Sequence, residues 1–341
     1  MTKRMNSEQR TAPDLFTPVP AGFVGIARLA QQSAHLDDGH EVEYFELPSR
    51  SLLNRCTSKR MPFTWTINPY RGCEFACKYC YASYTHEFME MRDGLDFERK
   101  IYAKQNASWL LRQDLKRVRA GEEIAIGTAT DPYQPAERKF GITRSILEEL
   151  SRHAGLELGI VTKSTLILRD LDLLKRIAEK NQVAINLTVT TTNAKLARIL
   201  EPRAPRPDLR LQVVRKLAGA GLQAGVICAP VLPGITDASG DLENLVGAAA
   251  QAGAQWFFSN PLFLKPCSEK IFMPFLEKEF PELAESYRQR YASQAFVSAA
   301  YRKRISEIVH RLCGKHGIGR RSGRSPKSTG DVPTETQLAL F

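Results

Sequence analysis

The chain has 341 residues, of which 43% are hydrophobic and 25% are charged, which is ordinary for a folded globular protein. No apolar run approaches the roughly 20 residues needed to cross a bilayer, and residues 1–10 lack the apolar core of a secretory signal, so we expect a cytoplasmic protein with no membrane partner. The formal net charge of +11 leaves two interpretations, a polyanion partner such as nucleic acid or a solvated basic tail.

Two segments precede the main domain. Residues 1–21 are polar and contain three prolines, so we expect this N-terminus to be disordered. Residues 22–61 are mixed in character and include an extended-looking run at Val42–Leu47. We expect them to form an N-terminal extension that packs on the main domain.

Short apolar strands alternate with amphipathic helices from residue 62 to residue 265. The six expected strands are Thr64–Ile67, Ile124–Gly127, Leu156–Val161, Val183–Val189, Gln223–Ala229 and Trp256–Ser259. The helices expected between them are Ala107–Arg119, Ser145–His153, Leu168–Lys180, Ala194–Leu200, Leu209–Ala220 and Leu242–Ala252. Because such strands are buried on both faces and joined by helices, the pattern predicts parallel βα units. Six units favour an α/β fold of the partial (β/α)6 TIM-type barrel kind, with a doubly wound open sheet as the alternative.

Three of the seven cysteines stand close together directly after the first expected strand. Cys73, Cys77 and Cys80 have the spacing C-x3-C-x2-C, and thiolates on so short a loop converge on one point, as a soft metal centre requires. An iron–sulfur cube held by three thiolates leaves one iron open to a ligand that is not protein. The alternatives are a structural zinc site with His86 as its fourth ligand, and buried cysteines grouped by chance.

This loop resembles the cysteine loop of the radical S-adenosylmethionine (SAM) enzymes. The wider string, from Ile67 to Cys73 and from Cys80 to Ala82, resembles the branch related to spore photoproduct lyase, and the resemblance covers roughly residues 62–265. It implies that the three cysteines hold a 4Fe–4S cluster and that SAM binds the open iron. It also implies that an electron donor such as flavodoxin or ferredoxin reduces the cluster, and that SAM is cleaved to a 5′-deoxyadenosyl radical.

The carboxyl ends of the expected strands hold the candidate SAM-binding residues, because both fold types place their chemistry there. Thr130 and Asp131 follow the second strand, where the resemblance implies a contact to the amino group of SAM, although the superfamily's usual Gly-Gly-Glu is absent from this sequence. Lys163 follows the third strand, and the resemblance implies that it pairs with the SAM carboxylate as a compact charge. A plain Asp-Pro turn and a solvated strand-end lysine are the competing interpretations.

Further candidates follow the fourth and fifth strands. The hydroxyl of Thr190 suits the ribose of SAM, although threonine is also a good strand former. Glu201 is a second candidate, and we expect it either to pair with Arg203 or to position the substrate. Ala229–Asp237 resembles the segment that contacts adenine in these barrels, and it is also an ordinary rigid loop.

A reaction of this kind needs a group that supplies or quenches a hydrogen atom. Cys228 on the fifth strand and Cys267 after the sixth are candidates, because the S–H bond of a thiol is weak. Tyr133 is a comparable candidate. For each cysteine, a small core residue is the competing interpretation.

The C-terminal part of the chain is expected to be helical over residues 266–317, with helices at Phe272–Phe280 and Leu283–Cys313. In the second helix Leu283, Tyr287 and Tyr291 recur at a spacing of i+4 and predict an apolar stripe against the barrel. The basic face of this helix is a candidate surface for nucleic acid.

Residues 318–341 are rich in Gly, Ser, Pro and Arg and predict a flexible basic tail. The tail ends in Gln-Leu-Ala-Leu-Phe, which resembles the pentapeptide with which bacterial DNA polymerases and repair proteins bind the DNA sliding clamp. The resemblance implies that the clamp would be contacted by Gln337, Leu338, Leu340 and Phe341. Docking of this end on the protein's own barrel and a chance match are the alternatives.

The sequence thus predicts a radical SAM enzyme, with a damaged or modified DNA base as its substrate by family resemblance. A base in duplex DNA would have to be flipped out to reach a barrel mouth. The alternatives are a radical SAM enzyme that modifies RNA or a protein, and a non-catalytic iron–sulfur protein that binds nucleic acid.

Overall fold

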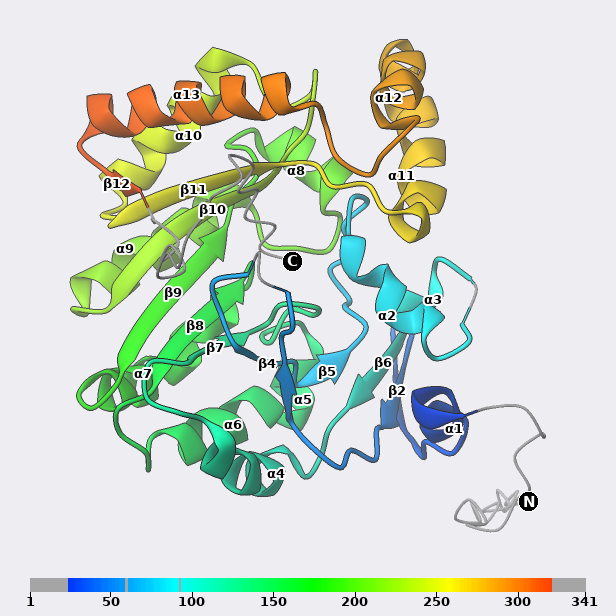
Figure 1. Ribbon diagram of the computed structural model, residues 1–341, viewed down its shortest axis with the longest axis vertical. Coiled ribbons are helices and arrows are strands. Elements are labelled where there is room, and N and C mark those ends of the chain that lie inside the picture. The colour runs from blue at the N-terminus through cyan, green and yellow to red at the C-terminus, as the bar shows by residue number, and fades with distance from the viewer. Residues whose placement is uncertain (1–23, 59–60, 92, 321–341) are drawn as a thin grey trace, which may run out of the picture.

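The computed structural model describes residues 24–58, 61–91 and 93–320, and its centre is a curved sheet of eight strands (Figure 1). In spatial order the strands are β12 (Gly319–Arg320), β11 (Trp256–Pro261), β10 (Gln223–Val231), β9 (Gln182–Thr188), β8 (Glu157–Thr162), β7 (Glu123–Ile126), β4 (Trp65–Ile67) and β3 (Leu53–Arg55). Every neighbouring pair from β12 to β4 is parallel, and β3 alone is antiparallel to its neighbour.

The order of the strands decides between the two expected folds. A doubly wound sheet reverses its strand order at a switch point, so that helices cover both faces. Here β4, β7, β8, β9, β10 and β11 follow one another in chain order without a reversal. Right-handed crossovers then place all connecting helices on one face, and the sheet curls away from them into an incomplete barrel. The partial (β/α)6 barrel is therefore confirmed, and the doubly wound alternative is wrong.

The barrel strands are buried because both of their faces are covered. Along β10 the consecutive residues Val226, Ile227 and Cys228 are all fully buried, which an amphipathic strand with one wet face does not show. On one side of the sheet Val226 and Cys228 belong to the main apolar core under the helices. On the other side Ile227 and Ala229 form a small cluster with Phe63.

Helices surround the outer face of the sheet (Figure 1). They are α4 (Ala107–Asp114), α5 (Ala136–Phe140), α6 (Ile142–Leu150), α7 (Leu171–Ala178), α8 (Ala194–Leu200), α9 (Pro207–Gly219), α10 (Ser239–Gln251) and α13 (Ala299–His316). In α6 the residues Ile142, Ile146 and Leu150 recur at i+4 and are buried, so one apolar stripe attaches the helix to the sheet.

A second, smaller sheet joins the N-terminal segment to the segment after the cysteine loop. Its order is β1 (His35–Gly39), β2 (Val42–Glu46), β6 (Lys100–Ala103) and β5 (Tyr70–Arg71). Strand β2 pairs in parallel with β6, so residues of the N-terminal extension lie directly beside the chain that flanks the cysteines. Three short helices lie around this sheet, namely α1 (Gly25–Gln31), α2 (Tyr84–Glu87) and α3 (Asp96–Arg99).

The C-terminal helices differ from the expected ones. Helix α11 (Pro266–Glu279) begins six residues before Phe272, with Pro266 in its first turn. The single helix expected over Leu283–Cys313 is wrong: α12 (Ala284–Tyr291) ends first, and α13 begins at Ala299. Between them Phe296 forms a bridge to Phe263, which holds this segment extended. The Ser298 side chain then accepts a hydrogen bond from the Tyr301 amide at 3.3 Å and caps α13.

The apolar stripe of α12 packs against the barrel as expected. The hydroxyl of Tyr287 donates to the carbonyl of Pro233 at 2.8 Å, and that of Tyr291 donates to the carbonyl of Leu262 at 3.0 Å. The basic face of α13 is partly neutralised, because Arg304 pairs with Asp237 at 3.1 Å. Part of the basic charge seen in the sequence is thus balanced by an acidic side chain of the same protein.

Among the described residues, none of the helices has the length and apolarity to cross a bilayer. The N-terminal residues 1–21 and the terminal pentapeptide with Gln337, Leu338, Leu340 and Phe341 lie outside the described residues. The expectations for both ends stay predictions.

Candidate active site

A cavity lies where the carboxyl ends of the barrel strands meet the cysteine loop. It has a volume of about 810 Å³ with the open solvent at its mouth included. Its wall includes Gly127–Asp131 after β7, Val161–Lys163 at the end of β8, Thr188 at the end of β9, and Asn260–Phe263 at the end of β11. Four of the six barrel strands, β8 to β11, supply lining residues from within the strand, because Ala229 and Pro230 of β10 also contribute. The segment after β7 supplies its share, and the loop after β4 carries the cysteines.

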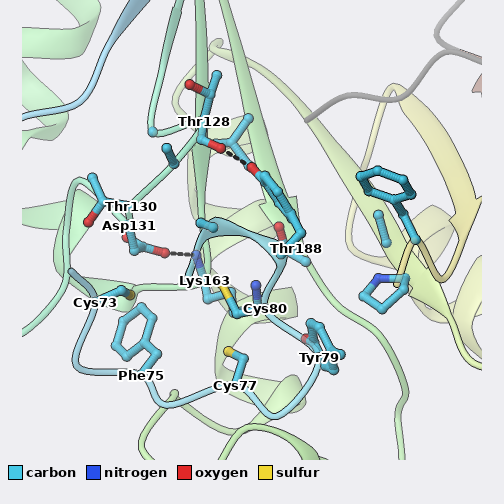
Figure 2. A pocket seen from close by; sticks show the side chains of 18 of the residues that line it. Cys73, Phe75, Cys77, Tyr79, Cys80, Thr128, Thr130, Asp131, Lys163 and Thr188 are labelled. Atoms are coloured by element: carbon cyan, nitrogen blue, oxygen red, sulfur yellow. Dashed lines mark hydrogen bonds between the residues drawn. The ribbon is translucent and has the colours of Figure 1, made fainter. Parts of the chain in front are cut away.

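The cysteine loop forms the remaining side of this cavity. Cys73, Cys77 and Cys80 all line it, and none of the three forms a disulfide (Figure 2). Gly72 begins the loop with φ +83°, and a Cβ there would stand 2.7 Å from the carbonyl oxygen of Lys100. Only glycine permits this tight entry next to β6, so Gly72 fixes where the cysteines start. The Lys78 amide donates to the carbonyl of Leu200 at 2.9 Å and anchors the middle of the loop.

The three thiols have the chemistry that an iron–sulfur cluster needs. Burial raises the pKa of Cys77 to about 12 and raises the pKa of Cys73 and of Cys80 as well. Three thiolates that face the same cavity are unfavourable unless a cationic centre compensates their charge. A soft, positively charged cluster supplies that compensation, so the donor set fits a 4Fe–4S cluster.

The zinc alternative lacks its fourth ligand in this structure. His86 is buried against Phe97 and Tyr102, and its Nε2 donates to the carbonyl of Lys100 at 3.0 Å, away from the cavity wall. Nowhere in residues 24–58, 61–91 and 93–320 do three or more His, Cys, Asp or Glu side chains have the arrangement that a single metal ion requires. A mononuclear zinc site with His86 is therefore wrong.

Thr130 and Asp131 line the cavity and also tie its parts together. The Asp131 carboxylate accepts hydrogen bonds from the Thr162 hydroxyl at 2.6 Å and the Tyr133 amide at 2.9 Å. It also accepts from the Lys163 amide at 2.7 Å (Figure 2). Burial raises the pKa of Asp131, and these hydrogen bonds oppose the rise. The end of β7 is thus fastened to the end of β8 by one carboxylate.

The Thr130 hydroxyl makes the second connection. It donates to the carbonyl oxygen of Gly72 at 2.6 Å, and Gln134 donates to the same oxygen at 3.1 Å. The Gln134 side chain in turn accepts from the Glu74 amide at 3.0 Å. These bonds hold the start of the cysteine loop against the end of β7, so that cysteines and strand ends keep a fixed distance.

Lys163 places a positive charge in the cavity. Its Nζ lies 5.8 Å from the ring centroid of Tyr79, and within the described part of the chain no carboxylate forms an ion pair with it. Burial alone would lower the pKa of Lys163, but the negative charges of a Cys77 thiolate and of the Glu201 carboxylate raise it on balance. The ammonium group is therefore charged and available to an anionic group inside the cavity.

Thr190 and Glu201 lie behind the cavity wall rather than on it. The carboxylate of Glu201 accepts hydrogen bonds from the Tyr79 hydroxyl and, at 3.3 Å, from the Thr190 hydroxyl. It also pairs with Arg210 at 2.5 Å between Nη2 and Oε2, and both side chains of this ion pair are at most 1% exposed. Tyr79 connects this buried group to the cavity, because its ring is part of the wall.

The expected pair between Glu201 and Arg203 is wrong. Arg203 pairs with Glu41 of the N-terminal segment at 2.9 Å, and Arg210 takes its place at Glu201. The sequence carried a signal for Arg210, since it stands at the spacing of the buried stripe of α9, with Val213, Val214 and Leu217. A charged residue in such a stripe requires a buried partner.

The three candidate hydrogen donors do not line the cavity. Cys228 is fully buried, with its sulfur 3.8 Å from the carbonyl of Thr190. Cys267 is 7% exposed, and its sulfur lies 3.8 Å from the carbonyl of Tyr81. Tyr133 is 1% exposed under the loop after β7. Three further polar residues line the cavity, namely Thr128, Thr188 and Asn260, and each lies at or just after the end of a barrel strand.

The comparisons with known proteins agree with this geometry. A family model described as "Radical SAM superfamily" matches residues 67–246. An uncharacterized protein of Mycobacterium tuberculosis is 34% identical over 302 residues, which are 88% of this chain and 88% of that protein. An uncharacterized protein of Methanocaldococcus jannaschii is 27% identical over 272 residues, which are 80% of this chain and 94% of that protein.

Among solved structures, the fold is similar to that of spore photoproduct lyase. One such structure, a variant with bound AdoMet and dinucleoside spore photoproduct, has a TM-score of 0.59 and 18% sequence identity. The match covers 79% of this chain and 77% of that chain. At this sequence identity the similarity shows a shared fold alone.

Proposed function

The chain belongs to the radical SAM superfamily of enzymes, and from that premise we propose that its cavity binds a 4Fe–4S cluster with SAM and serves the repair or modification of a base in DNA. One observation carries the proposal: three thiols of a single short loop and the carboxyl ends of the barrel strands line the same cavity. When bound, the cluster and SAM supply reductive cleavage of the sulfonium C–S bond and a 5′-deoxyadenosyl radical that abstracts hydrogen.

The protein's part in the cluster site is to bind, orient and exclude water. Cys73, Cys77 and Cys80 would hold the cluster, and its one site without a protein ligand would be open to SAM. Phe75 and Tyr79 line the same cavity and shield the thiolates from water, because their rings are buried among the cysteines.

Charged groups of the chain orient SAM. Lys163 binds the SAM carboxylate, since its ammonium group has no carboxylate partner in the described residues. Asp131 binds the SAM amino group: a carboxylate has about four lone-pair sites, and three are occupied by protein donors. Thr130 keeps the cysteine loop at the distance this requires.

Thr190 and Glu201 act as positioning residues in this proposal. The Glu201 carboxylate accepts from the hydroxyl of Tyr79, the residue directly before Cys80, and Thr190 donates to the same carboxylate oxygen. A fixed Tyr79 orients the cysteine loop with respect to β9. The effect on SAM is therefore indirect, through the wall of the cavity.

Three observations support DNA as the substrate. The net charge of +11 suits a polyanion. A protein of the same fold is described with AdoMet and a dinucleoside photoproduct bound to it. The terminal residues Gln337, Leu338, Leu340 and Phe341 resemble a sliding-clamp peptide and would bring the enzyme to DNA. Flavodoxin or ferredoxin is the proposed electron donor.

The first experiment tests the cluster. Anaerobic reconstitution should give a brown protein with about four iron and four sulfide per chain. Cys77→Ala should lose most of this iron, whereas Cys313→Ala, at a buried cysteine of α13 outside the cavity, should keep it. One zinc and no iron in the native protein would contradict the proposal.

The second experiment tests the reaction and its substrate. Reduced protein with SAM should release 5′-deoxyadenosine and methionine, and the yield should be compared with no addition, with undamaged DNA, with UV-irradiated DNA and with RNA. Stimulation by irradiated DNA above the other additions supports the proposed substrate. Iron without SAM cleavage in every arm would indicate the non-catalytic alternative.

A further inference from the structure

A second hollow, which we call the lateral pocket, opens on the side of the cysteine cavity. It has a volume of about 1310 Å³ with its open mouth included. Residues of β3 and β4 line it from one end of the barrel, and Phe263 and Phe296 line it from the segments after β11 and α12 at the other end. The pocket thus lies in the gap that the incomplete barrel leaves between its first and last strands.

Two cations face this pocket without an acidic partner. Lys104, directly after β6, is only 4% exposed, and Arg71 on the paired strand β5 has a buried Nε with no hydrogen-bond acceptor. Within the described ranges neither forms an ion pair with a carboxylate, and the nearest acceptor of Arg71 is the carbonyl of Thr85 at 3.4 Å. Burial first, and the Arg71 guanidinium second, lower the pKa of Lys104 to about 7. Two like charges side by side in a buried position are unfavourable and would be compensated by an anion.

Aromatic side chains form another part of the pocket lining. Phe263 and Phe296 are stacked, with ring centroids 4.4 Å apart and an angle of 24° between the planes. Tyr84 lies nearby, and the Nζ of Lys265 stands 4.2 Å from its ring centroid and 5.5 Å from that of Phe263. Phe88 is 62% exposed and lines the same pocket. Partly exposed rings next to a cation are typical of surfaces on which nucleobases stack.

We propose that the lateral pocket binds one nucleotide of a nucleic-acid strand, with its phosphate between Lys104 and Arg71 and its base on the aromatic wall of Tyr84, Phe263 and Phe296. The reason why a nucleotide is bound rests on the proposed function. The binding itself is independent of SAM cleavage. A phosphate accepts charge-assisted hydrogen bonds from both cations, and an extruded base replaces water on the rings. Of macromolecules that combine phosphate and aromatic groups, nucleic acid is favoured over a phosphopeptide by the net charge of +11.

The residues shared by the two hollows also indicate where the bound base lies relative to the SAM site. Tyr81, Thr128, Ala129 and Phe263 line both the lateral pocket and the cysteine cavity. A base seated on Phe263 is therefore adjacent to the SAM site and separated from it by the side chain of Tyr81. Lys104 and Arg71 line the lateral pocket but not the cysteine cavity, so the phosphate lies outside that cavity.

Equilibrium binding to the reconstituted holoprotein tests this proposal. The probes are the dinucleotide dTpdT, the ribose analogue UpU, thymidine, inorganic phosphate and phosphotyrosine. We expect dTpdT or UpU to bind at least about tenfold more tightly than thymidine, because thymidine has no phosphate to meet the two cations. The preference between dTpdT and UpU distinguishes a DNA from an RNA source.

Variants locate the binding. Lys104→Met should weaken dinucleotide binding about tenfold or more and make it less sensitive to salt, whereas Lys216→Met, at an exposed lysine of α9, should leave it unchanged. Phe263→Leu should weaken it about tenfold through loss of stacking, and provides a second test if Lys104→Met holds less iron than the wild type. Equal affinity of the wild type and both variants for the dinucleotide overturns the proposal. Tight binding of phosphotyrosine without binding of either dinucleotide overturns it in favour of a phosphopeptide.

The two proposals fail separately. If the protein cleaves SAM but substitution of Lys104 and of Phe263 leaves its dinucleotide affinity unchanged, only the proposal for the lateral pocket is refuted. Dinucleotide binding that depends on both residues, in a protein that never cleaves SAM, would refute only the enzymatic function.

Discussion

The hydroxyl of Tyr81 donates a hydrogen bond to the backbone carbonyl of Thr128, and the two residues together separate the cysteine cavity from the lateral pocket. The ring connects the cysteine loop to the end of β7, since Tyr81 directly follows Cys80 and Thr128 follows Gly127. The Tyr81 ring is a bulky part of this partition, which Phe263 also borders, and the hydroxyl fixes the position of the ring.

We expect Tyr81→Ala to join the two hollows and to let oxygen and water reach the cluster from the side. The visible absorbance of the reconstituted protein should then bleach several-fold faster in air. Tyr81→Phe keeps the ring, which also stacks on Tyr84, and should bleach at nearly the wild-type rate. Equal bleaching rates for Tyr81→Ala and the wild type would show that the ring is no barrier.

The buried ion pair between Arg210 and Glu201 supports the cysteine loop from behind. Burial alone would raise the pKa of Glu201, but Arg210 and Lys163 hold it below its ordinary value, so the carboxylate is charged. Arg210→Met leaves that charge buried without its partner and should lower the free energy of unfolding by about 3–5 kcal/mol. The double variant Arg210→Met/Glu201→Gln removes the charge as well and should recover part of the loss. Urea unfolding measures both, and a loss below about 1 kcal/mol in the single variant would contradict a buried charged pair.

Gly127 is required where the chain leaves β7. Its φ is +88°, and a Cβ there would stand 2.5 Å from the carbonyl oxygen of Val161 and 2.6 Å from the ring of Pro132. Gly121 has a similar φ of +82°, but nothing lies within 4 Å of its Cβ position. Gly121→Ala therefore measures backbone strain alone, roughly 1–2 kcal/mol. Gly127→Ala adds the overlap, and we expect a further loss of about 1–3 kcal/mol together with a lower iron content. Similar stability of the two variants would mean that the end of β7 yields easily.

The pH dependence of stability should report His86. Burial lowers its pKa to about 4 from an ordinary value of 6.5, so the folded protein binds fewer protons at this site than the unfolded chain. The stability that comes from the neutral ring is complete above pH 6.5 and is lost as the pH falls from 6.5 toward 4, by up to about 3 kcal/mol. His86→Gln has no such titration.

The measurement is the difference in unfolding free energy between His86→Gln and the wild type at several pH values. We expect the variant to gain on the wild type as the pH falls below about 6.5. His40→Gln, at an exposed histidine, serves as the control and should show no such gain. A difference that stays constant with pH would place the His86 ring in contact with solvent.

Local spacing was enough to predict the cysteine loop, the six barrel strands and most of their helices. Cys73, Cys77 and Cys80 are close in the chain, and strands such as β10 announce their burial through consecutive apolar residues. The order of strands follows from the chain order itself, because right-handed βα units add one after another.

Contacts between segments far apart in the chain could not be predicted from local spacing. Arg210 rather than Arg203 pairs with Glu201 because α9 returns to the end of β9, where Arg210 also donates to the carbonyl of Thr188 at 3.1 Å. The break between α12 and α13 depends on Phe296 meeting Phe263, which is 33 residues earlier in the chain.

The face of the sheet to which each strand side chain points could not be predicted from the sequence either. Successive side chains of a strand point to opposite faces, so a shift of one residue decides whether a side chain reaches the cavity. Ala229 lines the cavity, whereas the preceding Cys228, a candidate hydrogen donor, is buried on the other side. The apolar pattern of β10 is the same for both residues and does not distinguish them.

The central claim is that the cysteine loop and the strand ends form one site for a cluster and SAM. Its most direct test is the formation of 5′-deoxyadenosine by the reconstituted, chemically reduced protein under anaerobic conditions. We predict that the wild type forms 5′-deoxyadenosine from SAM and that Cys77→Ala, at equal protein concentration, forms none. A wild-type protein that carries about four irons per chain and still leaves SAM intact, with and without nucleic acid, would contradict the account.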